Sequence, residues 1–158
     1  MTRLVVVSNR CNLPRKGQAP GGLAVALTSA VRERGGMWFG WDGTVSDDYH
    51  RKATLTHIDG VDYATIPLSP DAYEGYYRGY ANRVLWPLCH YRPDAVQYHY
   101  RHDRQYRHTN ELLARKLLPL LQPDDLLWVH DYHLIPLGRA LRAAGVELRG
   151  LAGAEKRL

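Results

Sequence analysis

A short apolar run, RLVVVS at residues 3–8, is typical of a strand buried on both faces of a parallel sheet. A second run of this kind, LLWV, occupies residues 126–129. Apolar residues at helical spacing predict helices from the Gly21–Gly22 pair to Gly35, from Ser69 to Pro87, over residues 109–121 and over residues 132–144. Strands that alternate with helices favour an α/β fold with an open parallel sheet.

Three more apolar stretches predict strands in the first half of the chain. They are MWFGWDG at residues 37–43, ATLTHID at 53–59 and DYATIPL at 62–68, and their pairing stays open. Asp59 and Gly60 supply a short connection between the last two. In an open α/β sheet, ligands bind outside the carboxyl ends of the parallel strands. Polar residues that directly follow a strand are therefore the first candidates for a site.

The composition predicts a single domain in the cytoplasm. The chain has 158 residues, no apolar run near the roughly 18 residues of a membrane span, and an amino terminus without the long apolar core of a signal peptide. Cys11 and Cys89 show no metal-binding spacing, so we assign them no chemistry. The formal net charge of +5 favours anionic partners without choosing between nucleic acid, phosphorylated metabolites and a membrane surface.

The densest basic stretch is YHYRHDRQYRH at residues 98–108, where arginines and histidines alternate with tyrosines. Aromatic rings among cations can stack on nucleic-acid bases. The stretch is short, includes Asp103 and matches no nucleic-acid motif, and runs of charge usually face solvent. We therefore favour a solvated loop or helix face and expect no nucleic-acid partner.

Arg10 and the glycines Gly21 and Gly22 form the first candidate site. Arg10 directly follows the first strand, and the glycines open the next helix. An arginine can bind phosphate through two hydrogen bonds, and glycines let a ligand approach the N–H groups at a helix start. The alternative is a tight turn beside a surface arginine, because PGG is neither a dinucleotide fingerprint nor a P-loop.

The second and third candidates lie at residues 76–87 and 130–133. YYRGYANRVLWP places Tyr77 and Trp86 among other aromatic rings and amides, which suits a sugar but also suits packing against the sheet. HDYH follows the LLWV strand, and Asp131 could accept hydrogen bonds from sugar hydroxyls or cap the next helix. Two histidines and one aspartate make a weak case for a metal.

Six stretches taken in order closely resemble the amino-terminal part of the trehalose-6-phosphate synthase family. They are RLVVVSNR, GGLAVAL, GMWFGWDG, YYRGYANRVLWPLCHYR, KLLPLL and WVHDYHLIPLGRALR. That family consists of retaining glycosyltransferases with two Rossmann-like domains, the GT-B architecture. The resemblance implies that residues 1–149 form an incomplete amino-terminal, acceptor-side domain of this type.

The resemblance also implies a reaction and a set of binding residues. The family transfers glucose from a nucleotide sugar, usually UDP-glucose, to glucose 6-phosphate, by front-face substitution and without a metal or other cofactor. By motif, Arg10 would bind the acceptor phosphate, and Tyr77 and Asp131 would bind glucose 6-phosphate. Trp86 would line the acceptor pocket, and the Gly21–Gly22 pair would approach the donor. No residue is assigned as catalytic.

Residues 150–158, GLAGAEKRL, depart from the family pattern. In the family, an apolar strand, a loop histidine and a donor-binding domain follow at this point. We therefore expect this chain alone to be inactive or impaired and to lack a buried strand. We also expect it to aggregate or to depend on a partner, either a separately encoded carboxyl-terminal half or another copy of itself. The alternative function is a noncatalytic sugar-phosphate-binding module, or a remnant of one.

Overall fold

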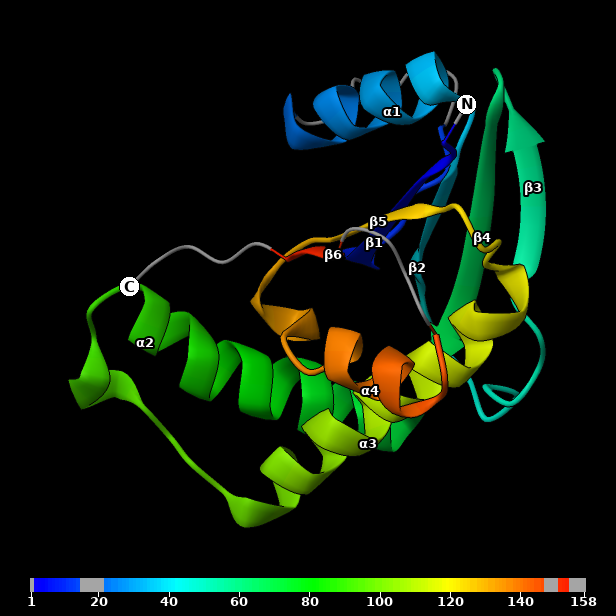
Figure 1. Ribbon diagram of the computed structural model, residues 1–158. Coiled ribbons are helices and arrows are strands. Elements are labelled where there is room, and N and C mark those ends of the chain that lie inside the picture. Colours follow the sequence, from blue (N-terminus) through cyan, green and yellow to red (C-terminus); the bar gives the residue numbers. More distant parts are fainter. Residues whose placement is uncertain (1, 15–21, 147–150, 154–158) are drawn as a thin grey trace.

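The computed structural model describes residues 2–14, 22–146 and 151–153 (Figure 1). Six strands form one sheet: β1 (Leu4–Arg10), β2 (Met37–Val45), β3 (Thr54–Ile58), β4 (Val61–Leu68), β5 (Leu126–Val129) and β6 (Leu151–Gly153). The α-helices are α1 (Gly22–Arg34), α2 (Trp86–Cys89), α3 (Tyr100–Leu117) and α4 (Leu137–Ala143). The remaining helices are a wide π-type helix, η1 (Ala72–Leu85), and three short 3-10 helices, η2 (Pro93–Ala95), η3 (Leu118–Leu120) and η4 (Tyr132–Leu134).

The strands follow the order β3-β4-β2-β1-β5-β6, and all neighbours are parallel except β3 and β4. Asp59 and Gly60 join these two strands with φ angles of +50° and +79°. Two consecutive positive φ angles are what a two-residue hairpin turn requires. The expected open sheet is confirmed, with one antiparallel hairpin at its edge.

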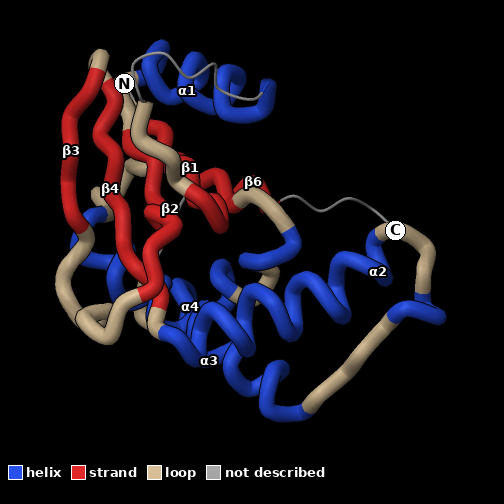
Figure 2. Tube along the Cα trace, turned by 180° about the vertical axis from the view of Figure 1, so that it is seen from behind, coloured by secondary structure: helices blue, strands red, loops and turns tan. Residues whose placement is uncertain are grey.

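Alternate side chains of β1 enter two separate cores, as a strand covered on both faces requires. Val5 and Val7 pack in the core that includes apolar residues of α3 and α4. Val6 packs in the other core, against Leu27 and Val31 of α1. Figure 2 shows α1 on one side of the sheet and α3 with α4 on the other. Because helices cover both faces of the sheet, the carboxyl ends of the strands are left for the loops that can carry a site.

The helix that begins after β4 starts where the sequence predicted. Ser69 Oγ accepts a hydrogen bond of 3.0 Å from the Ala72 N–H, which satisfies one of the free donors of the first turn. Pro87 does not interrupt the helix, because it lies in the first turn of α2, where a missing N–H breaks no hydrogen bond. The helical course ends two residues later, at Cys89.

Two expectations from the sequence are wrong in detail. The helix expected over residues 109–121 begins at Tyr100, so the basic stretch forms its first half. Ala144 is exposed instead of lying on the buried face of α4. The absence of a buried strand stays a prediction; Leu151–Gly153 pair in parallel with β5 and provide partners for its backbone groups.

Candidate functional site

The direction of the chain across the sheet reverses at β1. From β1 the chain moves to β2 on one side, and it later returns to β5 on the other side. Ligands of open α/β sheets bind at such a reversal, outside the carboxyl ends of the strands. Arg10 ends β1 and Asp131 follows β5, so both lie at the carboxyl ends of these two neighbouring parallel strands.

The end of β1 is shaped by an irregularity in its pairing with β2, between Ser8 and Arg10. Ser8 Oγ accepts a 2.7 Å hydrogen bond from Trp38 Nε1 and donates one of 2.7 Å to the Arg10 carbonyl. Asn9 is buried, and its Oδ1 accepts a 2.8 Å hydrogen bond from the Tyr76 hydroxyl. These bonds fix the backbone from which the exposed Arg10 side chain extends.

The Arg10 guanidinium lies over an aromatic ring and against a glycine. Its Cζ is 4.6 Å from the centre of the Trp41 ring, and its Nη2 donates to Asn12 Oδ1 at 3.0 Å. A Cβ atom at Gly43, within β2, would lie 2.1 Å from Arg10 Nη1, so a larger residue at this position would displace the guanidinium. Within the described residues the guanidinium has no carboxylate partner, which leaves its charge available to an anion.

Tyr77 on η1 links the two halves of this edge. Its ring meets Trp41 edge-on, with centroids 5.3 Å apart, and stacks on His133 at 5.6 Å. Edge-to-face and offset-stacked rings at these distances attract one another. The aromatic contacts therefore run without a break from the ring under Arg10 to the residue beside Asp131.

Asp131 has both of the roles that the sequence left open. Its Oδ1 accepts a 2.7 Å hydrogen bond from the Tyr132 N–H at the start of η4, as a helix cap does, and its Oδ2 lies 3.1 Å from His133 Nδ1. Although burial alone would raise the pKa of Asp131, the hydrogen bonds and the positive field of His133 and His130 lower it. The side chain is one-third exposed, so the ionised carboxylate can also accept hydrogen bonds from a ligand.

Two residues of α3 hold the loop that carries Asp131. The Tyr106 hydroxyl donates to the Tyr132 carbonyl at 2.7 Å, and the fully buried Asn110 Nδ2 donates to the His133 carbonyl at 3.1 Å. Burial raises the pKa of Tyr106 above its ordinary value, so its hydroxyl keeps its proton at neutral pH. The loop is thus fixed by groups that do not reach the site themselves.

The structure brings together three of the residues that the sequence selected, Arg10, Tyr77 and Asp131, through continuous contacts. Trp86 lies apart on α2, where it is 46% exposed and stacks on the His90 ring at 4.1 Å. Gly22 begins α1, whereas Gly21 lies outside the described residues.

Sequence reasoning missed Trp41, which lies in the middle of β2 and pairs with Arg10, the last residue of β1. It also gave no role to Asn9 and Tyr76. Both are buried, and their contact joins β1 to η1.

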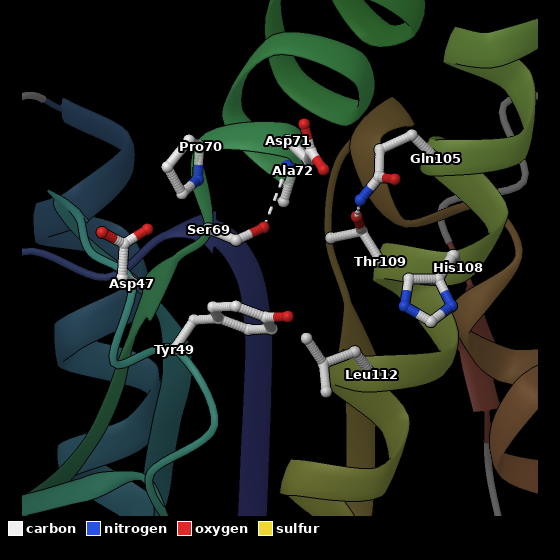
Figure 3. Close-up of a pocket in the computed structure, with 10 residues that line it drawn as sticks. All are labelled: Asp47, Tyr49, Ser69, Pro70, Asp71, Ala72, Gln105, His108, Thr109 and Leu112. Carbon is white, nitrogen blue, oxygen red and sulfur yellow. Dashed lines mark hydrogen bonds between the residues drawn. The ribbon is translucent and has the colours of Figure 1, made fainter.

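A pocket of about 340 Å³ lies apart from these residues, between the loop after β2, the start of η1 and α3 (Figure 3). Its buried hydroxyls already have partners: Ser69 Oγ accepts from Ala72, and Thr109 Oγ1 accepts from Gln105 Nε2 at 3.4 Å. The carboxylates on its rim are exposed. We therefore assign no ligand to this pocket.

The described part of the chain holds no group of three or more histidine, cysteine or acidic residues placed to bind a metal ion. None of its helices is long and apolar enough to cross a membrane. Burial raises the pKa of the Cys11 thiol to about 12, so this cysteine is not a reactive thiolate, and Cys89 is exposed on α2.

Comparison with known proteins gives one consistent result. The sequence model of glycosyltransferase family 20 matches residues 3–149. A trehalose-6-phosphate synthase from Sinorhizobium fredii is 48% identical over 154 residues, which cover 94% of this chain and 33% of that protein. The chain thus spans about a third of the length of the curated relatives it matches.

Solved structures agree with this result. The crystal structure of a UDP-forming α,α-trehalose-phosphate synthase from Burkholderia vietnamiensis superposes with a TM-score of 0.88 at 43% identity, over 94% of this chain and 32% of that one. An enzyme of the same description from Burkholderia xenovorans, in complex with glucose-6-phosphate, superposes with a TM-score of 0.83 at 48% identity, over 93% and 32%. The described fold is therefore that of one part of these longer proteins.

Proposed function

Because this chain belongs to glycosyltransferase family 20, we propose that its sheet edge binds the acceptor, glucose 6-phosphate, of a trehalose-6-phosphate synthase. In the proposed reaction, a hydroxyl of the bound acceptor attacks the anomeric carbon of UDP-glucose on the face from which UDP leaves. The products are trehalose 6-phosphate and UDP, and the hydroxyl proton departs with the diphosphate.

The observation that carries the proposal is the continuous row of Arg10, Trp41, Tyr77, His133 and Asp131. Its cation at one end suits a phosphate, the partly exposed Tyr77 ring suits the apolar C–H face of a sugar, and its carboxylate at the other end suits hydroxyl groups. A hexose phosphate presents these three chemistries in the same order.

The contribution of these residues to catalysis would be alignment of the acceptor. A reaction between two bound sugars gains most from holding the attacking hydroxyl close to the anomeric carbon, and none of the side chains in the row need form a covalent bond. Family resemblance adds Trp86 to the acceptor pocket and the Gly21–Gly22 pair to the donor side. We propose these as further contacts of the complete enzyme.

Calorimetric titration of the purified chain tests the proposal. Glucose 6-phosphate should bind, and glucose should bind at least tenfold more weakly, because it lacks the phosphate that Arg10 holds. Arg10→Gln should remove this difference, whereas Arg34→Gln, an exposed arginine at the end of α1, should preserve it. Equal affinity of the unaltered chain for glucose and glucose 6-phosphate would contradict the proposal.

The second candidate is a sugar-phosphate-binding module without turnover. The observation in its favour is that the contacts of the described site all suit the acceptor. None of them is placed to stabilise the diphosphate that leaves from the donor. UDP release that depends on both substrates would indicate the transferase. Thermal stabilisation by glucose 6-phosphate without UDP release would indicate the module, and addition of a separate donor-binding domain would then test dependence on a partner.

A further inference from the structure

His133 is a buried histidine whose ring nitrogens have few partners. The residue is 4% exposed and lies in η4, directly after β5. Neither Nδ1 nor Nε2 makes a hydrogen bond of good geometry within the described residues, although Nδ1 is 3.1 Å from Asp131 Oδ2. Buried polar side chains are usually satisfied, so an exception needs a physical reason.

Three aromatic rings contact the imidazole. Tyr132 stacks on it with centroids 4.2 Å apart, and Tyr77 of η1 stacks at 5.6 Å with an interplanar angle of 21°. Tyr76 adds a tilted contact at 6.1 Å. These contacts and the Asn110 bond to its carbonyl leave the imidazole little freedom to rotate. Its orientation therefore keeps Nδ1 toward Asp131.

The two carboxylate oxygens of Asp131 contact different groups. Oδ1 accepts from the Tyr132 N–H at 2.7 Å, and Oδ2 faces His133 Nδ1. Because a carboxylate only accepts hydrogen bonds, this contact favours the tautomer with the proton on Nδ1. Two groups of its own loop thus contact the carboxylate, one on each oxygen.

We propose that His133 is a positioning residue, which orients the Asp131 carboxylate through Nδ1–H and supports the Tyr77 ring through stacking. The inference rests on the proposed acceptor site and goes beyond it, because His133 itself touches no substrate. It joins an acidic group at the end of β5 to an aromatic group on η1, so that one residue fixes the geometry of both. Acceptor affinity should depend on it more than global stability does.

A histidine that serves packing alone is the competing explanation, and two substitutions separate the roles. His133→Phe keeps a ring in contact with Tyr77 and Tyr132 but removes the donor. His133→Asn keeps a donor near the Nδ1 position but removes the ring. The proposal predicts that His133→Phe weakens glucose 6-phosphate binding about tenfold, because Asp131 loses the polar group that orients its carboxylate, and that His133→Asn weakens it less.

The ligand-free readout is the Asp131 carboxyl titration, followed by carbon NMR. His133→Phe should raise the pKa of Asp131, and His133→Asn should restore it most of the way. The other groups that act on or face this carboxylate are His130 and the hydroxyls of Tyr76, Tyr106 and Tyr132, and both variants retain them.

His57→Phe is the matched control, because His57 Nδ1 lies 2.7 Å from Asp62 Oδ1 in the distant β3–β4 hairpin. It should change neither acceptor affinity nor the Asp131 titration. An Asp131 pKa that is the same in His133→Phe and the unaltered chain would overturn the inference, even if the acceptor binds. Failure of the unaltered chain to bind glucose 6-phosphate would instead refute the proposed function and leave the titration as the test of His133.

Discussion

Asp131 has a backbone conformation that residues with a side chain rarely adopt, with φ at +87° and ψ at 153°. Such a conformation costs of the order of 1–3 kcal/mol and persists only where the surroundings enforce it. Here the enforcing contacts come from α3, through the carbonyls of Tyr132 and His133. The strained residue lies just after β5, at the end of the sheet that carries the candidate site.

The lowered pKa of Asp131 predicts how its contribution to stability depends on pH. A carboxylate with a depressed pKa stabilises the fold above the unfolded-state pKa, about 3.9, and the contribution disappears as pH falls through the lower folded-state pKa. Asp131→Asn should therefore cost about 1 kcal/mol at pH 7, a value discounted because the side chain is one-third exposed. Urea unfolding of both chains from pH 7 to pH 3 measures the difference, which should shrink only below about pH 4. A difference that grows on acidification would contradict this assignment.

Gly43 offers a second prediction at the scale of one residue. Its φ is +94°, and a Cβ atom there would collide with the Arg10 guanidinium. Gly43→Ala should strain the backbone by about 1 kcal/mol and also displace Arg10 from Trp41, which should weaken glucose 6-phosphate binding about tenfold. Gly60→Ala is the control, because Gly60 has φ +79° but open space around its Cβ position. It should show the loss of stability in thermal melts without the loss of affinity.

At the scale of elements, the contact between α3 and η4 holds the loop that carries Asp131 in place. Asn110 is fully buried on α3, and its Nδ2 donates to the carbonyls of Tyr106 and His133. Asn110→Ala leaves the His133 carbonyl buried without its donor and should cost about 2 kcal/mol of unfolding free energy. The Leu134 N–H, which bonds to the Asp131 carbonyl, should then exchange with solvent faster. Glu111→Ala, at an exposed position on the same helix, should change neither quantity measurably.

The elements differ in how well the sequence predicted them. The apolar runs of β1 and β5 identify buried strands directly, and Gly35 and Gly145 end their helices with φ angles of +57° and +85°, as helix stops should. The first turns of α3 could not be identified in this way, because Tyr106 is the only buried residue between Tyr100 and His108. A helix whose apolar face begins so late has no helical period to detect in its first half.

The candidate site depended on information beyond local pattern. Placing Arg10 and Asp131 at the same ends of neighbouring strands follows from the fold rule for parallel strands. The aromatic stretch offered Tyr77 either to a sugar or to packing, and family resemblance decided for the sugar. Trp41 and His133 belong to the site because both contact Tyr77, from which they lie 36 and 56 positions away in the sequence. The spacing of residues along the chain does not predict contacts between residues this far apart in the sequence.

At the scale of the whole molecule, a buried ion pair that stabilises the fold and the candidate binding site lie at opposite ends of the strands. Arg3 precedes β1 and Asp125 precedes β5, and two hydrogen bonds of 2.8 and 2.6 Å join their side chains. The hydrogen bond to Asp125 raises the pKa of Arg3. Asp125 is almost fully buried and also accepts from the Gln122 N–H at 2.8 Å. The pair thus fixes β5 beside β1 at the amino ends of the strands, whereas Arg10 and Asp131 lie at their carboxyl ends.

Arg3→Met should therefore separate folding from binding. It leaves the buried Asp125 carboxylate without its cation, which should lower the free energy of unfolding by about 3 kcal/mol. Below the melting transition, calorimetry should still give the glucose 6-phosphate affinity of the unaltered chain, because the substitution touches no residue at the ligand edge. Arg32→Met is the control: Arg32 pairs with Asp59 at 3.7 Å on the surface, and an exposed pair contributes about 0.5 kcal/mol or less. A loss of affinity in Arg3→Met that exceeds its unfolded fraction would show that the two edges are coupled through the sheet.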